Sequence, residues 1–428
     1  MNKSYLGILL LCLVWQRLTA QPVFQTVMPL SDGATSWSVV HPDGVALLLA
    51  DGGEARLFLL SPDMSVQASW RVQGLPRPEE MQMLGMTVSD QEVSLYFRSG
   101  DGEAWQAMVV RKETGSSSQV VLDPALLRGR SAYWGTVTQG GRLHVLRIPP
   151  EGRGLRLCRF EGGQALRTLD MPVRRWDILQ RYQQRLVQVV PDEVPSLAAV
   201  ASPAKLYPGE GYVRITLDAP DSTHILEIDL TLGQIQEYAI AMPQTATAVR
   251  YHTFLHGDWL IQAVLGTDSV IVALHHLRTG RSAGTLALGR GSVLAASLYQ
   301  TDESGETRSL SDIGSWMDLA LLAPGWAVSV RSGPDSAGYE LLLGGLTPVQ
   351  VRGATGLVLE TQYREVVLSC QMQGGSLQPA GLPLAAGRQP VSVFRTKKPA
   401  RTVFTWQGRQ YVGFYDPVRK VYQVHPVR

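Results

Sequence analysis

The amino-acid sequence predicts an all-β fold of short antiparallel strands, and three observations support this class. Apolar and polar residues alternate along many short segments, such as Tyr212–Asp218 and Ile225–Leu230, and a period of two is the pattern of a strand. Turns rich in glycine and aspartate, such as Gly162-Gly163, separate these segments and favour hairpins. Hydrophobic residues make up 45% of the 428 residues, which excludes a disordered chain because this much apolar surface offsets the ordering entropy.

The turns that end groups of strands recur at a regular spacing. Gly115, Gly163, Gly233 and Gly280 each separate two strand-like segments, and their positions differ by 48, 70 and 47 residues. The long interval contains a proline-rich insert, Pro191–Pro208. A four-stranded unit of about 40 to 50 residues has the length of one β-propeller blade. The repeat therefore predicts a propeller.

We expect one β-propeller domain over residues 21–428, with about seven four-stranded blades and six or eight as the alternatives. The expected blades are, in chain order, 36–75, 82–122, 131–171, 174–242, 248–289, 292–352 and 355–428. The segment Val23–Leu30 is expected to add a closing strand to the last blade, because ring closure removes exposed sheet edges.

Residues Trp176–Val190 of the fourth blade fit two structures. Their apolar residues have helical spacing up to the helix breaker Pro191. The repeat register instead requires two strands that turn at Gln183-Gln184. We favour the hairpin and keep the helix as the alternative.

Two segments resemble a known repeat. Leu226–Gly233 resembles the turn of quinoprotein-like and YVTN-like β-propellers, in which a strand is followed by Asp, two or three residues and Thr-Gly. Val270–Gly280 is similar, with His276 in the place of that Asp, and the Trp common after Thr-Gly in quinoprotein repeats is absent from both. The resemblance implies the propeller superfamily and no particular function.

The first twenty residues predict export. Lys3 precedes the ten-residue apolar run Leu6–Trp15, and Ala20 provides a small residue before the expected cut at Gln21. Ten apolar residues are too few to span a hydrocarbon core of about 30 Å. A large residue before Cys12 argues against a lipoprotein. We therefore expect a signal peptide at 1–20 and a mature chain in the periplasm or outside the cell, without a transmembrane segment.

Cys12 is removed with the signal peptide, so the mature chain contains two cysteines, Cys158 and Cys370. Export places them in a compartment that permits disulfides. Cys370 shares one strand face with Val366, Leu368 and Met372 and has the environment of a small buried hydrophobe. We expect both cysteines to be free thiols.

The C-terminal segment 388–428 is strongly basic, with nine basic residues and one acidic residue. The remainder of the mature chain is correspondingly acidic. Five of these basic residues lie among aromatic residues and form what we call the basic patch: Arg395, Lys397, Lys398, Arg401 and Arg409. Such a pattern can bind anionic polymers. Export argues against nucleic acid and favours an envelope protein or an anionic envelope component, and a solvated blade edge is the alternative.

Other motifs carry little chemistry. Gly280–Gly284 matches G-x-S-x-G, but we expect a turn between two strands rather than a nucleophile elbow. Asp101-Gly102 is expected to be a hairpin turn, and Asp51 and Glu54 to be turn carboxylates that favour solubility. The histidines His252, His256, His275 and His276 are too few and too scattered for a zinc site. We expect no catalytic residues, metal or cofactor.

The sequence therefore predicts a monomeric, exported, non-enzymatic binding or scaffold protein of the bacterial cell envelope. The alternative is a glycan-acting hydrolase or lyase whose carboxylates come from several blades and meet at the channel mouth. Convergence of three or more ionisable groups at that mouth would favour the enzyme.

Overall fold

A computed structural model describes most of residues 22–426. The residues outside the description are 1–21, 32, 53, 78, 101–103, 123–131, 150–152, 183–185, 190–196, 294–295, 303–305, 333–337, 353–357, 374–375, 379–399 and 427–428. The predicted signal peptide and the turn at Asp101-Gly102 are among them. In the described part of the chain, no helix has the length and apolarity needed to cross a membrane.

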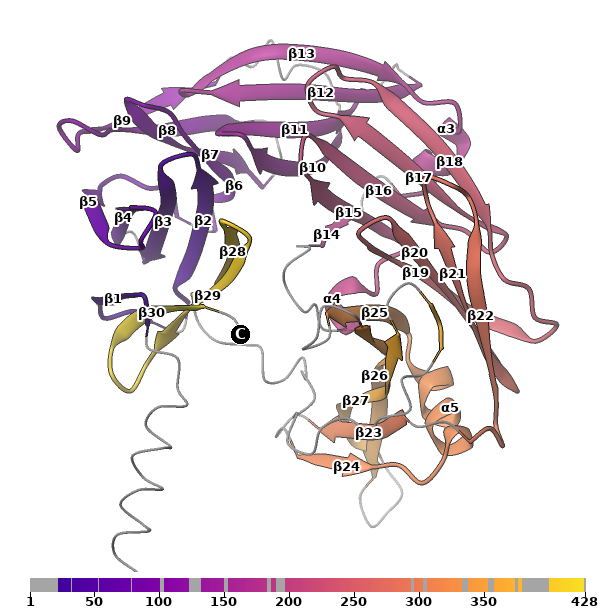
Figure 1. The fold of residues 1–428 in the computed structure, drawn as a ribbon. Coiled ribbons are helices and arrows are strands. Elements are labelled where there is room, and N and C mark those ends of the chain that lie inside the picture. Colours follow the sequence, from indigo (N-terminus) through magenta and orange to yellow (C-terminus); the bar gives the residue numbers. More distant parts are fainter. Residues whose placement is uncertain are drawn as a thin grey trace, which may run out of the picture.

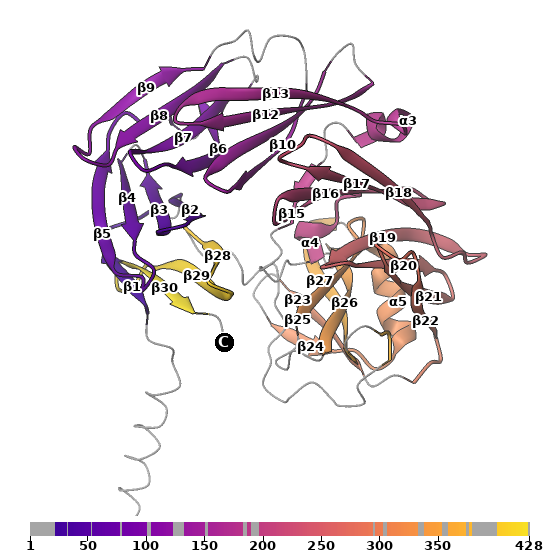
Figure 2. The same ribbon diagram turned by 45° about the horizontal axis from the view of Figure 1, so that its top comes forward.

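The described strands form seven sheets that follow one another around a central axis (Figures 1 and 2). Blade 1 contains β2 (Thr35–His41), β3 (Gly44–Asp51), β4 (Glu54–Leu60) and β5 (Val66–Val72). Blade 2 contains β6 (Met81–Val88), β7 (Glu92–Ser99), β8 (Trp105–Arg111) and β9 (Ser117–Val121). Blade 3 contains β10 (Ala132–Gln139), β11 (Arg142–Ile148), β12 (Gly154–Glu161) and β13 (Gln164–Pro172).

The later blades are larger or more irregular. Blade 4 contains β14 (Leu186–Gln188), β15 (Ala204–Gly209), β16 (Tyr212–Asp218), β17 (Ser222–Asp229) and β18 (Ile235–Ala241). Blade 5 contains β19 (Ala248–His256), β20 (Trp259–Gly266), β21 (Ser269–His276) and β22 (Ser282–Gly289). Blade 6 contains β23 (Ala296–Asp302), β24 (Thr307–Ser309), β25 (Ala327–Ser332), β26 (Gly338–Arg352) and β27 (Val358–Gln373). Blade 7 contains β28 (Thr402–Trp406), β29 (Arg409–Asp416), β30 (Val421–Pro426) and β1 (Phe24–Val27).

The chain is thus an all-β propeller of about seven blades, as the sequence predicts. The described helical segments are short: α3 (Trp176–Leu179), the 3₁₀ turn η1 (Gln180–Tyr182), α4 (Leu197–Val200) and α5 (Ile313–Leu322).

The N-terminal strand completes the last blade, which confirms the expected closing strand. β1 pairs antiparallel with β30, from Phe24 opposite Val424 to Val27 opposite Val421. The blade therefore combines residues from both ends of the chain, and separating them would expose an open sheet edge.

Most inner strands are buried on both faces because they contribute to two interfaces. In β3, Leu47 belongs to the core shared with Tyr422 of blade 7, whereas Leu48 belongs to the core shared with Leu95 of blade 2. Successive side chains of a strand point to opposite faces. Some inner strands, such as β3, therefore read as continuous apolar runs. Others, such as β16, alternate apolar residues with polar residues that are also buried.

The boundary between the last two blades was predicted wrongly. β27 was expected to begin the blade at 355–428, but it pairs along its length with β26, with Leu341 opposite Cys370. It also pairs with β23, with Leu298 opposite Leu368. β27 therefore belongs to blade 6. Alternation within a segment does not reveal which distant strand lies beside it, which is why the sequence misplaced this strand.

The favoured hairpin in blade 4 was also wrong. Residues Trp176–Tyr182 form α3 and η1, and Ile178 and Leu179 are buried. β14 then pairs parallel to β15 as a short fifth strand. The helical spacing of the apolar residues was the correct signal. Gln183 and Gln184 lie outside the described residues.

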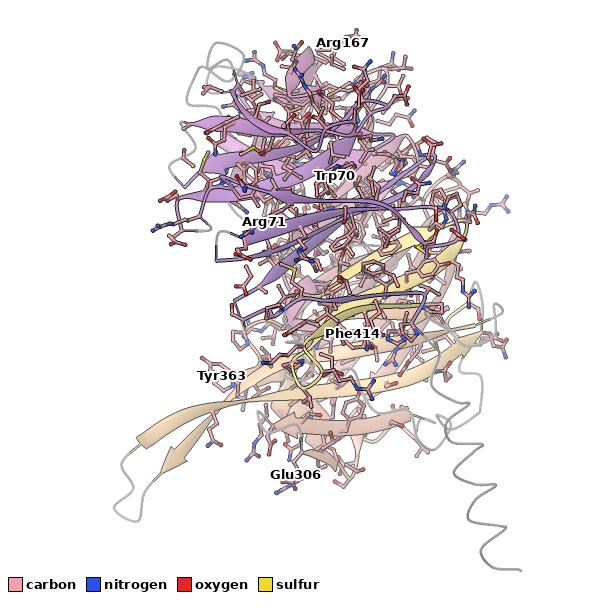
Figure 3. All side chains as sticks on the ribbon, turned by 90° about the vertical axis from the view of Figure 1, so that its left-hand side faces the viewer. Trp70, Arg71, Arg167, Glu306, Tyr363 and Phe414 are labelled. Carbon is pink, nitrogen blue, oxygen red and sulfur yellow. The ribbon has the colours of Figure 1, made fainter. Side chains whose placement is uncertain are left out.

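The β26–β27 hairpin extends beyond its neighbours. The ladder between β25 and β26 reaches Gly344, and the ladder between β23 and β27 reaches Arg364. Beyond these points the two strands pair only with each other. Figure 3 shows this hairpin projecting from the ring, with Tyr363 labelled on it.

The two cysteines are free, as expected, and both are buried, although burial was expected for Cys370 alone. Cys158 lies on β12 of blade 3, and Cys370 lies on β27 of blade 6. Burial raises the pKa of both thiols, and that of Cys370 reaches about 11. Both therefore remain protonated and unreactive at neutral pH.

Candidate functional site

The proline-rich insert of blade 4 joins three blades. After the undescribed residues 190–196, α4 packs against β25 and β26 of blade 6. The Nε2–H group of His252 in blade 5 donates to the carbonyl oxygen of Val200 at 2.6 Å. Its Nδ1 accepts from the backbone N–H of Val328 in blade 6 at 3.1 Å. These two bonds hold His252 as the neutral tautomer protonated at Nε2.

A buried ion pair lies beside this histidine. Lys205 Nζ donates to Asp218 Oδ2 at 2.7 Å and to the carbonyl oxygen of Ser202 at 2.9 Å, and both charged side chains are 0% exposed. Asp218 also accepts from the backbone N–H of Thr253 at 3.1 Å and from its hydroxyl at 2.5 Å. We call Lys205, Asp218, His252 and Thr253 the buried polar cluster.

The buried polar cluster has the residue types of a catalytic site but the environment of a structural one. Its members lie on blades 4 and 5, and its polar atoms bond to one another or to backbone groups of the insert and blade 6. Burial, and secondarily the charge of Lys205, lowers the pKa of His252 well below its usual value. A substrate cannot contact groups that are fully buried and already hydrogen-bonded, so the cluster connects blades.

Sequence reasoning missed this cluster. It considered His252 only as one of four histidines too scattered for a zinc site, and it gave no role to Lys205 or Asp218. The sequence holds one weak signal, a lysine within the apolar strand Ala204–Gly209. A buried lysine requires a paired acidic group. The sequence does not show which residue of a neighbouring strand lies beside Lys205.

A second network links blades 4 and 5 nearer the surface. Arg214 donates to Glu227 at 2.5 Å, to Asp258 at 2.8 Å and to the carbonyl oxygen of Gly257 at 2.9 Å. The guanidinium also lies 4.6 Å from the ring centre of Tyr212. The carboxylates of Glu227 and Asp258 are therefore both paired with the guanidinium of Arg214.

The other sequence motifs have ordinary positions. Gly280 lies in the turn between β21 and β22, and Ser282 begins β22, so the segment joins two strands as expected. Gly280 adopts a φ of 64° that glycine tolerates. Among the described residues, no group of three or more His, Cys, Asp or Glu side chains is arranged to hold a metal ion. The ring of His276 contacts Trp259 edge-on.

The structure separates the part of the basic patch that it describes. Arg401 precedes β28, and Arg409 begins β29 after a turn. Arg401 lies just before the first residue of β28, and Arg409 lies opposite Trp406, the last residue of β28. The five residues of β28 therefore separate the two arginines by about 16 Å along the strand direction. Arg395, Lys397 and Lys398 lie outside the described residues.

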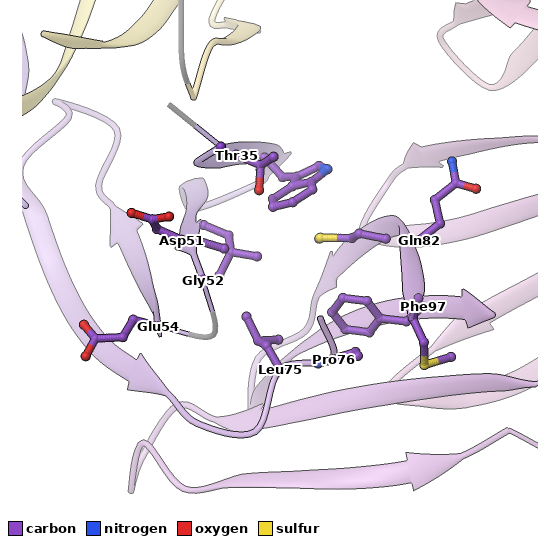
Figure 4. A pocket seen from close by; sticks show the side chains of 14 residues that line it. Thr35, Asp51, Gly52, Glu54, Leu75, Pro76, Gln82 and Phe97 are labelled. Carbon is purple, nitrogen blue, oxygen red and sulfur yellow. The ribbon is translucent and has the colours of Figure 1, made fainter. Parts of the chain in front are cut away.

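A cavity of about 360 Å³ lies between blades 1 and 2 (Figure 4). It is formed where β2 and β6 begin and where β3 and β7 end. Most of its lining is apolar or small, and the residues that line it are Gly33, Thr35, Trp37, Leu48, Ala50, Asp51, Gly52, Glu54, Leu75, Pro76, Met81, Gln82, Met83 and Phe97. The sequence did not indicate this cavity because its walls come from two blades.

Two carboxylates lie at the rim of this cavity. Asp51 accepts hydrogen bonds from the backbone N–H and the hydroxyl of Ser31, both at 2.6 Å. Glu54 pairs with Arg71 at 2.6 Å, and both of these side chains are exposed. In Figure 4, Asp51 and Glu54 lie on the side of the cavity opposite Phe97. The expected turn carboxylates thus flank an apolar cavity.

Comparisons with known proteins do not identify a family for this chain. No protein-family model matches the chain, and no curated protein matches it. Among solved structures, the chain is similar to a structure described as that of the Dos1 propeller, with 9% identity, 95% of each chain covered and a TM-score of 0.39. It is also similar to the dihydro-haem d1 dehydrogenase NirN, with 11% identity, 96% of this chain and 75% of that chain covered, and a TM-score of 0.36. The propeller architecture itself follows from the seven sheets described above.

Proposed function

We propose that the protein is a non-enzymatic binding or scaffold protein of the bacterial cell envelope, acting as a monomer. The observation that supports this proposal is that two groups of converging charged side chains are already paired within the protein. In the described residues, the buried polar cluster and the Arg214 network bond internally and connect blades. The ring surface and the cavity between blades 1 and 2 remain for contacts with other molecules. Neither of these two networks favours the glycan-acting hydrolase or lyase, because their carboxylates are already paired with Lys205 and Arg214.

Export is part of this proposal, and the first twenty residues support it. The protein recovered from the periplasm or the medium is expected to begin at Gln21, because Ala20 is the small residue at the signal cleavage site. Amino-terminal sequencing of this material measures the cut. Recovery of chains that still begin with Met1 would contradict export.

The basic patch is the proposed contact with an anionic envelope component or an acidic envelope protein. Its charges add to those of the rest of 388–428, while the remaining mature chain is acidic. Such an asymmetry steers anionic partners. Surface contacts of this kind weaken as the Debye length falls from about 10 Å at 0.1 M salt to about 3 Å at 1 M.

Simultaneous replacement of Arg395, Lys397, Lys398 and Arg401 by glutamine is expected to abolish salt-sensitive binding to vesicles containing phosphatidylglycerol. Co-sedimentation at about 0.1 M and about 1 M salt measures the loss. A matched control removes four exposed arginines of other blades, and these are Arg56, Arg111, Arg167 and Arg281. Equal loss in both variants would show that net charge, and not the patch, governs binding.

A further inference from the structure

The cavity between blades 1 and 2 has the size of a ligand site. Its volume of about 360 Å³ lies within the range of about 300 to 1,000 Å³ that small-molecule sites occupy. It opens at one end of the blades, beside the β3–β4 turn and the linker that contains Leu75 and Pro76. Two rigid sheets therefore form most of its walls, and a ligand would find the site largely preformed.

The walls favour a flat apolar group. Trp37 and Phe97 supply aromatic surface, and Met81 and Met83 supply flexible thioether side chains. Methionine adapts to irregular shapes and makes favourable contacts with aromatic rings. Leu48, which is fully buried, lies at the apolar base of the cavity. An aromatic ring inserted here would exchange water for apolar contacts on both sides.

The rim favours a positive charge. Both hydrogen bonds to Asp51 come from neutral donors of Ser31, and among the described residues no lysine, arginine or histidine forms an ion pair with Asp51. A carboxylate has about four acceptor sites, so the fixed carboxylate of Asp51 retains capacity for another donor.

We propose that this cavity binds a small organic cation that consists of an aromatic or otherwise apolar body and an ammonium group. The body occupies the space between Trp37 and Phe97, and the ammonium group donates to Asp51. An anionic ligand of the same shape would approach the carboxylate of Asp51 and is therefore disfavoured. Glu54 adds little to this preference because Arg71 offsets its charge. This proposal does not depend on the envelope function proposed above.

Three probes with the same indole body test the charge preference: tryptamine is cationic, tryptophol is neutral and indole-3-acetate is anionic. Ligand-observed NMR titration of the full mature chain is expected to give the order cation, neutral, anion, from tightest to weakest. A charge pair at a partly exposed site corresponds to about a threefold to fivefold difference in Kd. Asp51→Asn should remove the advantage of tryptamine over tryptophol and leave the binding of tryptophol unchanged.

A second pair of variants tests the location. Gly33 lines the cavity, and a Cβ atom there would meet only Ser31 Oγ, at 3.7 Å. Gly33→Leu should therefore fill the mouth without backbone strain and abolish binding of tryptamine and tryptophol. Gly291→Leu is the control, because a Cβ atom at Gly291 meets nothing within 4 Å and this residue lies in another part of the ring.

Three results would overturn the proposal. They are the absence of binding by all three probes at about 1 mM, tighter binding of the anion than of the cation, and equal binding by Gly33→Leu and Gly291→Leu. Unchanged circular dichroism spectra and unfolding midpoints of the variants exclude misfolding as the cause of a loss.

Discussion

Replacement of Lys205 by methionine is expected to lower the free energy of unfolding by about 3 to 5 kcal/mol. The side chains of Lys205 and Asp218 are fully buried, so removal of the lysine leaves a carboxylate without its cation in the interior. The hydrogen bonds from Thr253 remain but do not neutralise the charge. The loss should therefore be far larger than for a pair on the surface.

Urea denaturation followed by circular dichroism measures this effect. Arg71→Met is the matched control, because Arg71 pairs with Glu54 at a similar distance while both side chains are mostly exposed, and such pairs contribute about 0 to 1 kcal/mol. The double variant Lys205→Met/Asp218→Asn should lose less than the two single variants together, since no charge is left unpaired. Equal losses in Lys205→Met and Arg71→Met would contradict the structural role of the cluster.

The second large effect concerns pH. Stability is expected to fall as the pH decreases below about 6.5, by about 1.4 kcal/mol per pH unit for each buried histidine. Burial, with the positive charges of Arg159 and Arg142, lowers the pKa of His144 to about 4, and burial beside Lys205 lowers the pKa of His252 well below its usual value. Between the lowered pKa and the usual one, the unfolded chain binds a proton that the folded chain does not bind. Acid therefore favours unfolding.

His144→Gln tests the sign and the size of this effect. Between about pH 7.5 and about pH 5, the variant should lose about 2 kcal/mol less stability than the unaltered protein. Urea titrations at several pH values measure this difference. A steeper loss in His144→Gln than in the unaltered protein would reverse the predicted sign.

Much of the fold could be predicted from local patterns. Alternating strands such as Tyr212–Asp218, together with glycine turns such as Gly162-Gly163, identified the class and the boundaries of blades 1, 2, 3 and 5 to within a few residues. These features depend on neighbouring residues along the chain. The closing strand around Val23–Leu30 was also predicted, because a ring of antiparallel sheets needs a partner for its last edge.

The errors occurred where the sequence was compatible with more than one local structure or with more than one neighbouring strand. Trp176–Tyr182 fits both a helix and a strand, and the repeat register favoured the wrong one. β27 was assigned to the wrong blade because its apolar face is suited to any sheet. Pairing with β23 and β26 decided its position, and such pairing between distant segments is not encoded in the pattern of a single strand.

The sequence by itself determined the blade repeat, the charge asymmetry and the buried character of Cys370. Only the tertiary structure decided which polar residues meet. Lys205 and His252 are 47 positions apart, and the cavity brings Asp51 of blade 1 together with Phe97 of blade 2. The physical reason is that the residue pattern of a strand specifies which face of the strand is buried. The neighbour on that face depends on how complete sheets pack against one another.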